Sequence, residues 1–276
     1  MSSEAKTHPF HMVDPSPWPI VGATAGLVTA IGSIMYMHGS SIFMIVPGFG
    51  LIFLTFYLWC RDIIKEANAS DGGNAAFHSE QVKHGLRMGM MLFIASEVMF
   101  FFAFFWAWFN SSVPAISAAA HDVWPPAGIV PLHTWDLPFL NTLILLTSGA
   151  TLTWAHHALN GRNRKNLKLG LLMTIGLGIL FTCLQAYEYA HATFSITDGI
   201  YGSGFYLATG FHGFHVIVGT IFLAVCYKRA VKGDFSPGAH VGFQSAAWYW
   251  HFVDVVWIFL FCAVYWWGSA GYDFTY

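Results

Sequence analysis

The sequence predicts an all-α integral membrane protein with seven transmembrane helices, and three observations support this fold class. Hydrophobic residues make up 56% of the 276 residues and charged residues only 9%, whereas roughly a quarter of the residues in soluble domains are charged. Seven apolar runs are long enough to cross a bilayer core, which takes about 20 helical residues. The basic residues also alternate between successive connections in step with these runs.

The apolar runs are separated by polar or Pro/Gly-rich stretches such as DVWPPAGIVPLHTWDLP. The chain shows no internal repeat, and no connection is long and regular enough for a soluble domain. We therefore expect a single membrane domain over residues 1–276. Its predicted spans are about 18–37, 42–60, 86–109, 139–158, 169–189, 205–227 and 246–267.

All 12 lysines and arginines fall on one side of this arrangement. They precede the first span or lie between spans two and three, four and five, and six and seven. Basic residues concentrate on the side that is not translocated, so the N-terminus is predicted inside and the C-terminus outside. The residues are Lys6, Arg61, Lys65, Lys83, Arg87, Arg162, Arg164, Lys165, Lys168, Lys228, Arg229 and Lys232.

Several function classes are excluded at this point. A net charge of -2 and a pI of about 6.7 give no basic surface for nucleic acid. No nucleophile motif, phosphate-binding glycine loop or dinucleotide fingerprint is present, so we predict no catalytic residue. The four cysteines form no CxxC or zinc pattern and are interpreted as buried thiols. They are Cys60, Cys183, Cys226 and Cys262.

Ionisable side chains at membrane depth are candidates for function, because burying a charge there costs several kcal/mol. Glu97 lies near the middle of the third span, and four further groups on spans six and seven reach a similar depth. These five are predicted to form one polar cluster, and three interpretations stay open: a packing network, proton handling by Glu97, or contact with lipid or another subunit. The other four are His212, His215, His251 and Asp254.

The same histidines raise the question of a metal. His212 and His215 share one helix face, and His251 is the candidate to oppose them, whereas the adjacent His156 and His157 diverge by about 100° around a helix. Hydrogen-bonded core histidines are the simpler interpretation, so we predict no metal site. Glu188, near the outer end of span five, is expected to be solvated or locally hydrogen-bonded.

Four long motifs make the sequence specific: SEVMFFFAFFWA, TWAHHA, ATGFHGFHVIVGT and AAWYWHFVDVVW. Together they resemble cytochrome c oxidase subunit III. VDPSPWPI, VWPPAGI and ITDGIYGSGF fit that family in the same order, so the resemblance covers nearly the whole chain. It implies a fold in which helices one and two and helices three to seven form two bundles, separated by a V-shaped lipid-binding cleft.

The resemblance also implies a role. A family member carries no haem or copper itself and packs against subunit I, which holds these cofactors and reduces oxygen to water, with subunit II in the same complex. It binds structural phospholipid, supports proton uptake and prolongs the catalytic lifetime. Glu97 matches the family's buried, carbodiimide-reactive carboxylate. The residues that match its lipid headgroup contacts are Trp59, Arg61, Lys65, Glu66 and Arg229.

Two positions depart from the family pattern. Cys60 stands where a second tryptophan is usual, which weakens one expected lipid contact, and Gln244 replaces a usual glutamate. Near the N-terminus, His8 and His11 precede the first span on the predicted inner face. They are interpreted either as a proton-collecting surface for subunit I or as an inert tail.

Two other functions were weighed against this one. Subunit III of a quinol oxidase resembles the sequence but typically lacks the first two helices, which residues 18–60 supply. An autonomous proton transporter would often show inverted repeats or broken helices, and neither is visible. The expected location is an inner membrane, that of a bacterium in preference to that of a mitochondrion.

Overall fold

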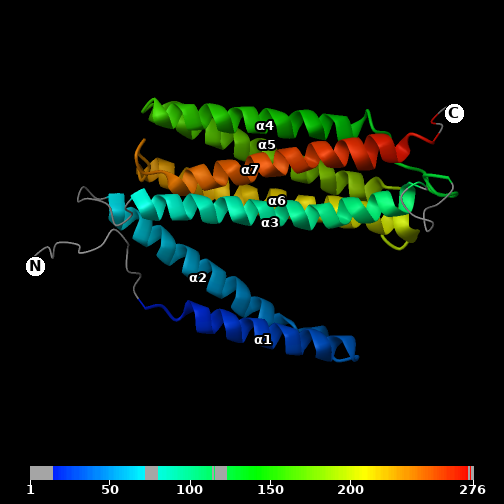
Figure 1. The fold of residues 1–276 in the computed structure, drawn as a ribbon, viewed down its shortest axis with the longest axis horizontal. Coiled ribbons are helices and arrows are strands. Elements are labelled where there is room, and N and C mark those ends of the chain that lie inside the picture. The colour runs from blue at the N-terminus through cyan, green and yellow to red at the C-terminus, as the bar shows by residue number, and fades with distance from the viewer. Residues whose placement is uncertain (1–14, 72–79, 114, 116–122, 273, 275–276) are drawn as a thin grey trace, which may run out of the picture. The chain divides into compact units, whose positions relative to one another are not determined.

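The computed structural model describes residues 15–71, 80–113, 115, 123–272 and 274 (Figure 1). The secondary-structure elements within these residues are helices. Within them, seven helices are long and apolar enough to cross a membrane, which confirms the predicted fold class. They are α1 (Trp18–Met37), α2 (Val46–Asp71), α3 (Glu80–Ser112), α4 (Leu137–Asn160), α5 (Arg164–His191), α6 (Gly199–Lys232) and α7 (Val241–Leu260). Three short elements complete the set: η1 (Ile42–Met44), η2 (Phe261–Trp266) and η3 (Trp267–Ser269).

Several helices extend well beyond the apolar runs that predict them. α3 has 33 residues and α6 has 34, so at 1.5 Å per residue each is about 50 Å long, against a hydrocarbon core of about 30 Å. The apolar run marks only the part of a helix that lies in hydrocarbon. The ends continue as helix in polar sequence, because the backbone hydrogen-bond ladder needs no apolar side chains.

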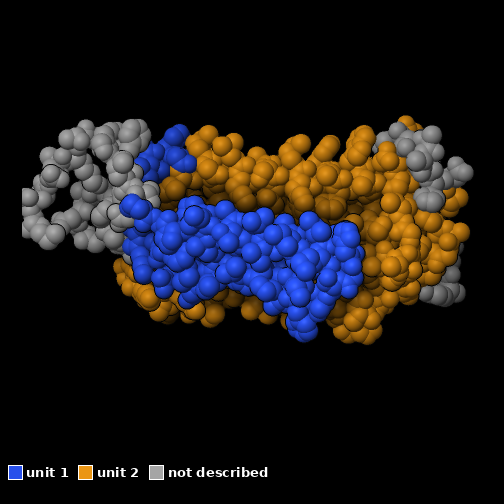
Figure 2. Space-filling view, turned by 90° about the horizontal axis from the view of Figure 1, so that it is seen from below, with its two compact units in different colours: residues 1–85 blue, residues 86–276 orange. Residues whose placement is uncertain are grey.

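The chain divides into two compact units, residues 1–85 and 86–276, which Figure 2 colours separately. The first unit is built on the α1–α2 hairpin. Gly48 lies so close to Thr29 that a Cβ there would overlap it, and Gly32 approaches the Met44 carbonyl in the same way. Ala25 of α1 is fully buried. Small residues therefore let the two helices pack closely.

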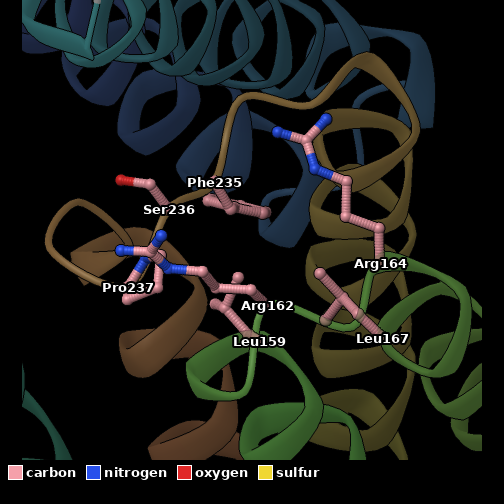
Figure 3. A pocket seen from close by; sticks show the side chains of 7 residues that line it. All are labelled: Leu159, Arg162, Arg164, Leu167, Phe235, Ser236 and Pro237. Atoms are coloured by element: carbon pink, nitrogen blue, oxygen red, sulfur yellow. The ribbon is translucent and has the colours of Figure 1, made fainter.

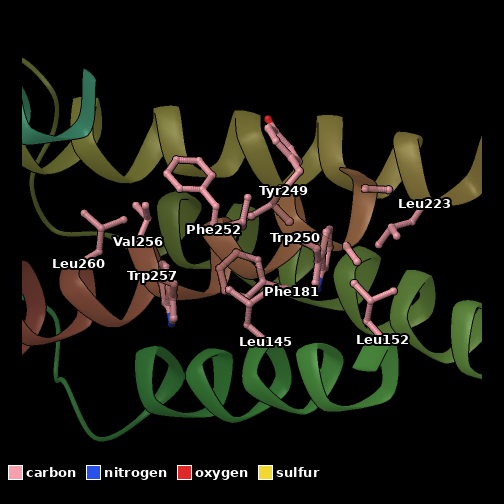
Figure 4. Packing of buried hydrophobic residues seen from close by; sticks show 14 of the residues in the cluster. Leu145, Leu152, Phe181, Leu223, Tyr249, Trp250, Phe252, Val256, Trp257 and Leu260 are labelled. Atoms are coloured by element: carbon pink, nitrogen blue, oxygen red, sulfur yellow. The ribbon is translucent and has the colours of Figure 1, made fainter. Parts of the chain in front are cut away.

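The second unit contains most of α3 and all of α4 to α7 (Figures 1 and 4). Within it α7 is the most buried of the seven helices. Side chains from α4 and α5, such as Leu145, Leu152 and Phe181, point at Trp250 and Trp257 of α7 (Figure 4). All five are buried, with exposures of 0%. α7 is thus buried on the face that meets α4 and α5, whereas Val255 and Phe259 on another face are 54% and 60% exposed.

Tryptophan indoles add directed bonds between these helices. Trp250 donates its Nε1–H to Ser148 Oγ at 2.9 Å, and Trp257 donates to Thr142 Oγ1 at 2.9 Å. A Cβ at Gly178 would lie 2.7 Å from the ring of Trp250, so only glycine leaves room for it. In hydrocarbon, where water supplies no competing bonds, such contacts fix both rotation and depth of a helix.

Candidate functional site

Glu97 and His215 form a pair between α3 and α6. Each lies at the midpoint of its helix, and Glu97 Oε2 is 2.8 Å from His215 Nε2. The Glu97 side chain is 21% exposed and that of His215 is 7% exposed. On its other side, His215 Nδ1 lies 2.7 Å from the Phe211 carbonyl oxygen.

This geometry limits how the pair can be protonated. A carbonyl oxygen only accepts, so His215 Nδ1 carries a hydrogen and donates it to Phe211. Nε2 then either accepts a hydrogen from a neutral Glu97 or, in an imidazolium, donates one to a carboxylate. In both cases one proton lies between Glu97 and His215, and the pair has no net charge. A neutral pair is the form that suits a site in hydrocarbon.

Aromatic rings enclose the imidazole of this pair. The ring of Phe101 lies 5.1 Å from that of His215, and those of Phe214, Phe252 and Tyr249 lie between 5.7 and 6.1 Å. These rings come from α3, α6 and α7. They keep water from the histidine and leave Glu97 as its polar partner on the α3 side.

His212 is one turn from His215 but has a different partner. Its Nε2–H donates to the Val253 carbonyl of α7 at 3.1 Å, and its Nδ1 is buried without a hydrogen-bond partner among the described residues. The ring stacks at a tilt against Trp257, with centroids 5.1 Å apart. His212 therefore ties α6 to α7 and is not bonded to Glu97.

His251 and Asp254 form a second pair, on α7. Their Nδ1 and Oδ2 atoms are 3.3 Å apart, and Thr153 of α4 lies 3.3 Å from His251 Nε2. Gly149 of α4 makes room for the carboxylate, because a Cβ there would overlap Asp254 Oδ2. The five predicted polar groups thus lie in two pairs, with His212 apart from both.

Among the residues that the structure describes, no three His, Cys, Asp or Glu side chains come close enough to hold a metal ion. The imidazoles of the two pairs and of His212 are each engaged in hydrogen bonds within the protein. These polar groups therefore provide hydrogen bonds between helices, and Glu97 and His215 share one proton.

A buried network around Glu188 was not singled out from the sequence. Glu188 is only 3% exposed, and its Oε1 accepts hydrogen bonds from Tyr265 Oη at 2.6 Å and from Gln185 Nε2 at 3.0 Å. Asn141 of α4 extends the network by donating to Gln185 at 3.4 Å. Of the two expected states, the carboxyl is thus locally bonded and not solvated.

The predicted lipid-binding residues of α2 lie together in the first unit. Trp59 is 42% exposed, and the side chains of Arg61 and Lys65 are 49% and 65% exposed. Asp62, which the sequence did not single out, lies between the two cations at 3.6 and 3.5 Å and accepts the indole N–H of Trp18 at 2.8 Å. Glu66, also on α2, has an interaction partner of its own.

The fifth predicted lipid contact, Arg229, is engaged within the second unit. Its side chain is only 12% exposed, its Nε is 3.8 Å from Asp234 Oδ2, and its guanidinium carbon lies 4.6 Å from the ring centre of Phe235. Nearby, the departure Gln244 accepts a 2.9 Å hydrogen bond from Arg87 Nε, which ties α7 to α3 with a neutral amide. The other departure, Cys60, is partly exposed.

The predicted proton-collecting pair, His8 and His11, lies outside the described residues. So does residue 6, the first of the 12 basic residues.

Comparison with known proteins gives one consistent result. Residues 8–269 match the model of a family described as cytochrome c oxidase subunit III. The chain is 54% identical over 269 residues to cytochrome c oxidase subunit 3 of Prototheca wickerhamii, with 96% of this chain and 100% of that protein covered. It is 52% identical to the proteins of the same name from Chondrus crispus (98% and 98% covered) and Dugong dugon (96% and 99% covered).

Proposed function

The chain belongs to the cytochrome c oxidase subunit III family, and from this premise we propose that it is a supporting subunit of the oxidase, without a redox centre of its own. In this role it packs on subunit I, with subunit II in the same complex. It binds structural phospholipid, supports proton uptake and prolongs catalytic lifetime while the complex reduces oxygen to water in aerobic respiration.

The observation that carries this proposal is the Glu97–His215 pair. A redox or proton-conducting subunit needs groups free to bind a metal or to pass protons along a line. Here the mid-membrane histidines are engaged in bonds between or within helices, and the Glu97–His215 pair holds one proton with no net charge. Apolar side chains occupy residues 91–94 before Glu97 and residues 98–105 after it along α3. Such a pair is better suited to holding α3 and α6 together in a subunit that packs on subunit I than to carrying a proton across the membrane.

The phospholipid part of the proposal rests on α2. Trp59, Arg61 and Lys65 combine an amphipathic ring with two largely exposed cations on one stretch of a membrane helix, which suits an anionic headgroup at the bilayer surface. The family resemblance adds Glu66 and Arg229 and the V-shaped cleft. Asp62, 3.6 and 3.5 Å from these two cations, holds them near each other.

The orientation follows from the basic residues, and we propose an inner membrane with the N-terminus inside and the C-terminus outside. A cysteine engineered within Ala118–His121, a stretch outside the described residues, should react with an impermeant thiol reagent from outside. One at Asn163, the N-cap of α5, should react only from inside. The native cysteines are replaced first. If both positions react from the same side, the topology is wrong.

The supporting role is tested by removing the chain from the purified oxidase and recording the optical spectrum per mole of subunit I. We expect the haem bands to keep their position and intensity. A second sample, with the chain present but Glu97 and His215 both replaced by alanine, tests whether the bond between α3 and α6 keeps the chain folded well enough to stay on the complex. Loss of a haem or copper signal on removing the chain would show that it contributes to a redox centre, contrary to the proposal.

A further inference from the structure

A pocket of about 280 Å³ lies at one end of the second unit, where the turn between α4 and α5 meets the connection between α6 and α7 (Figure 3). Water occupies about 30 Å³ per molecule in the liquid, so the space exceeds that of a few ordered waters. Four apolar residues and three polar ones line it: Leu159, Leu167, Phe235 and Pro237, and Arg162, Arg164 and Ser236.

The two arginines extend on either side of Phe235 (Figure 3). Both are exposed, and within the described part of the chain neither guanidinium has a hydrogen bond or ion pair with an acceptor. Asp234, the acidic residue of the α6–α7 connection, pairs instead with Arg229, which lies over Phe235. The pocket therefore presents two positive charges that no acidic residue in the described part of the chain neutralises.

The backbone at Arg162 adds to the unusual character of the site. Its φ is 56°, a left-handed conformation that favours glycine or asparagine. The residue follows the end of α4, where Arg162 N–H donates to the Leu159 carbonyl at 3.0 Å and Asn163 N–H to that of Ala158 at 2.8 Å. Such helix ends commonly carry glycine at this position. Arginine is thus held here at a cost in backbone stability, and its side chain reaches the pocket.

The depth of the pocket is set by the helix ends around it. α4 ends at Asn160, α5 begins at Arg164, α6 ends at Lys232 and α7 begins at Val241. α4 has 24 residues and α5 has 28, so they are about 36 and 42 Å long and reach the headgroup layers of a bilayer that is about 40–45 Å thick in all. At that level the expected ligand has an anionic head and an apolar body. Guanidinium groups bind phosphate oxygens through directed, charge-assisted bonds, and leucine and phenylalanine side chains accept acyl or glycerol carbons.

From these observations we infer that the pocket between the α4–α5 turn and the α6–α7 connection binds the phosphate of an anionic phospholipid through Arg162 and Arg164. It shares no residue with the α2 group of Trp59, Arg61 and Lys65, so it is a second lipid site. An acidic segment of another subunit would satisfy the charges, but the mainly apolar lining at headgroup depth favours a lipid. Free inorganic phosphate would leave that lining unused.

The test uses the whole oxidase complex with the photoreactive residue p-benzoylphenylalanine at Ser236. This position lines the pocket, and Ser236 bonds Ala239 and His240 through its own backbone atoms, so the substitution preserves the connection. The delipidated complex is titrated with phosphatidylglycerol or with zwitterionic phosphatidylcholine and irradiated. We expect phosphatidylglycerol to crosslink to this chain at lower concentration than phosphatidylcholine.

Two variants and one control identify the residues. Arg164→Gln should raise the phosphatidylglycerol concentration needed for half-maximal crosslinking about fivefold, which corresponds to the about 1 kcal/mol typical of one basic residue near a membrane surface. Arg162→Gly should do the same while keeping or raising the thermal stability of the complex, because glycine relieves the left-handed backbone. Lys165→Gln removes the same charge from the same helix start but does not line the pocket, and should have little effect.

Three results would overturn the inference. They are equal crosslinking of the two lipids, crosslinking to another polypeptide in place of lipid, and an equal loss of phosphatidylglycerol crosslinking in Lys165→Gln. Competition by millimolar inorganic phosphate as strong as that by phosphatidylglycerol would show a general anion site, and would also count against it.

Discussion

Replacing Glu97 by glutamine or by alanine separates two roles of the Glu97–His215 pair. His215 Nδ1 donates to the Phe211 carbonyl, so in the absence of a carboxyl the ring is neutral and its Nε2 is an acceptor. The glutamine amide can donate to Nε2 from nearly the same position. Alanine offers no donor. Glu97→Gln therefore removes the shared proton and keeps the bond, whereas Glu97→Ala removes both.

The expected costs differ for the same reason. Glu97→Gln exchanges a charge-assisted or acid hydrogen bond for a neutral one, a loss of about 1 kcal/mol. Glu97→Ala leaves His215 Nε2 without a partner on a side chain that is 7% exposed, which costs about 1–3 kcal/mol, and a void adds to this cost. We expect Glu97→Gln to keep substantial oxidase activity and proton pumping, and Glu97→Ala to impair assembly or lifetime more.

The assay compares three quantities in membranes and in the purified complex: thermal retention of this chain on subunit I, oxygen consumption, and protons pumped per electron in vesicles. Glu80→Gln is the matched control, because it makes the same change on the same helix at a side chain that is 79% exposed and pairs with Lys83. It should alter stability by less than about 0.5 kcal/mol.

Two results would refute this reasoning. If Glu97→Gln abolished pumping while assembly and electron transfer stayed intact, Glu97 would be part of a proton path. If Glu97→Ala were as stable as Glu97→Gln, the bond to His215 would not hold the helices together.

Two further predictions concern the inner face. Replacing Arg61 and Lys65 together by alanine should lower the phospholipid retained by the purified complex and shorten its active lifetime, because two exposed cations of the α2 group are lost; unchanged lipid content would count against this site. If His8 and His11 collect protons, replacing both should lower the turnover of the oxidase at alkaline pH. Turnover that stays unaltered from about pH 6 to 9 would show that they form an inert tail.

The sequence predicts the number and positions of the helices well, and the contacts between them less well. Apolar runs and basic loops identify seven helices because hydrocarbon imposes both patterns locally. A stripe of small residues in α1, at Gly22, Gly26 and Ala30, also suggests the face that packs on another helix. In the structure Gly22 does face α2, since a Cβ there would lie 3.7 Å from Thr55, but Gly26 has no neighbour within 4 Å of a Cβ and Ala25 is the buried residue. The rotation of α1 depends on α2, which spacing within α1 alone does not encode.

The candidate site shows the same limit. Glu97 and the histidines are visible from the sequence because charged and polar groups are rare at that depth. Their pairing is not, since His212 and His215 share a helix face and yet one bonds α7 and the other α3. Glu188 was expected to be solvated or locally hydrogen-bonded, but the sequence did not indicate its partner Tyr265, which lies 77 residues away in sequence. Contacts between distant helices decide both cases.

The most direct test of the supporting role is the number of oxygen molecules that one complex reduces before it inactivates. It is measured with this chain present, removed, and added back, at equal haem content. We expect that removal leaves the initial rate of electron transfer largely intact but lowers that number severalfold, and that adding the chain back restores it. An unchanged number without the chain, or an initial rate that falls to zero, would show that the chain does not have a supporting role.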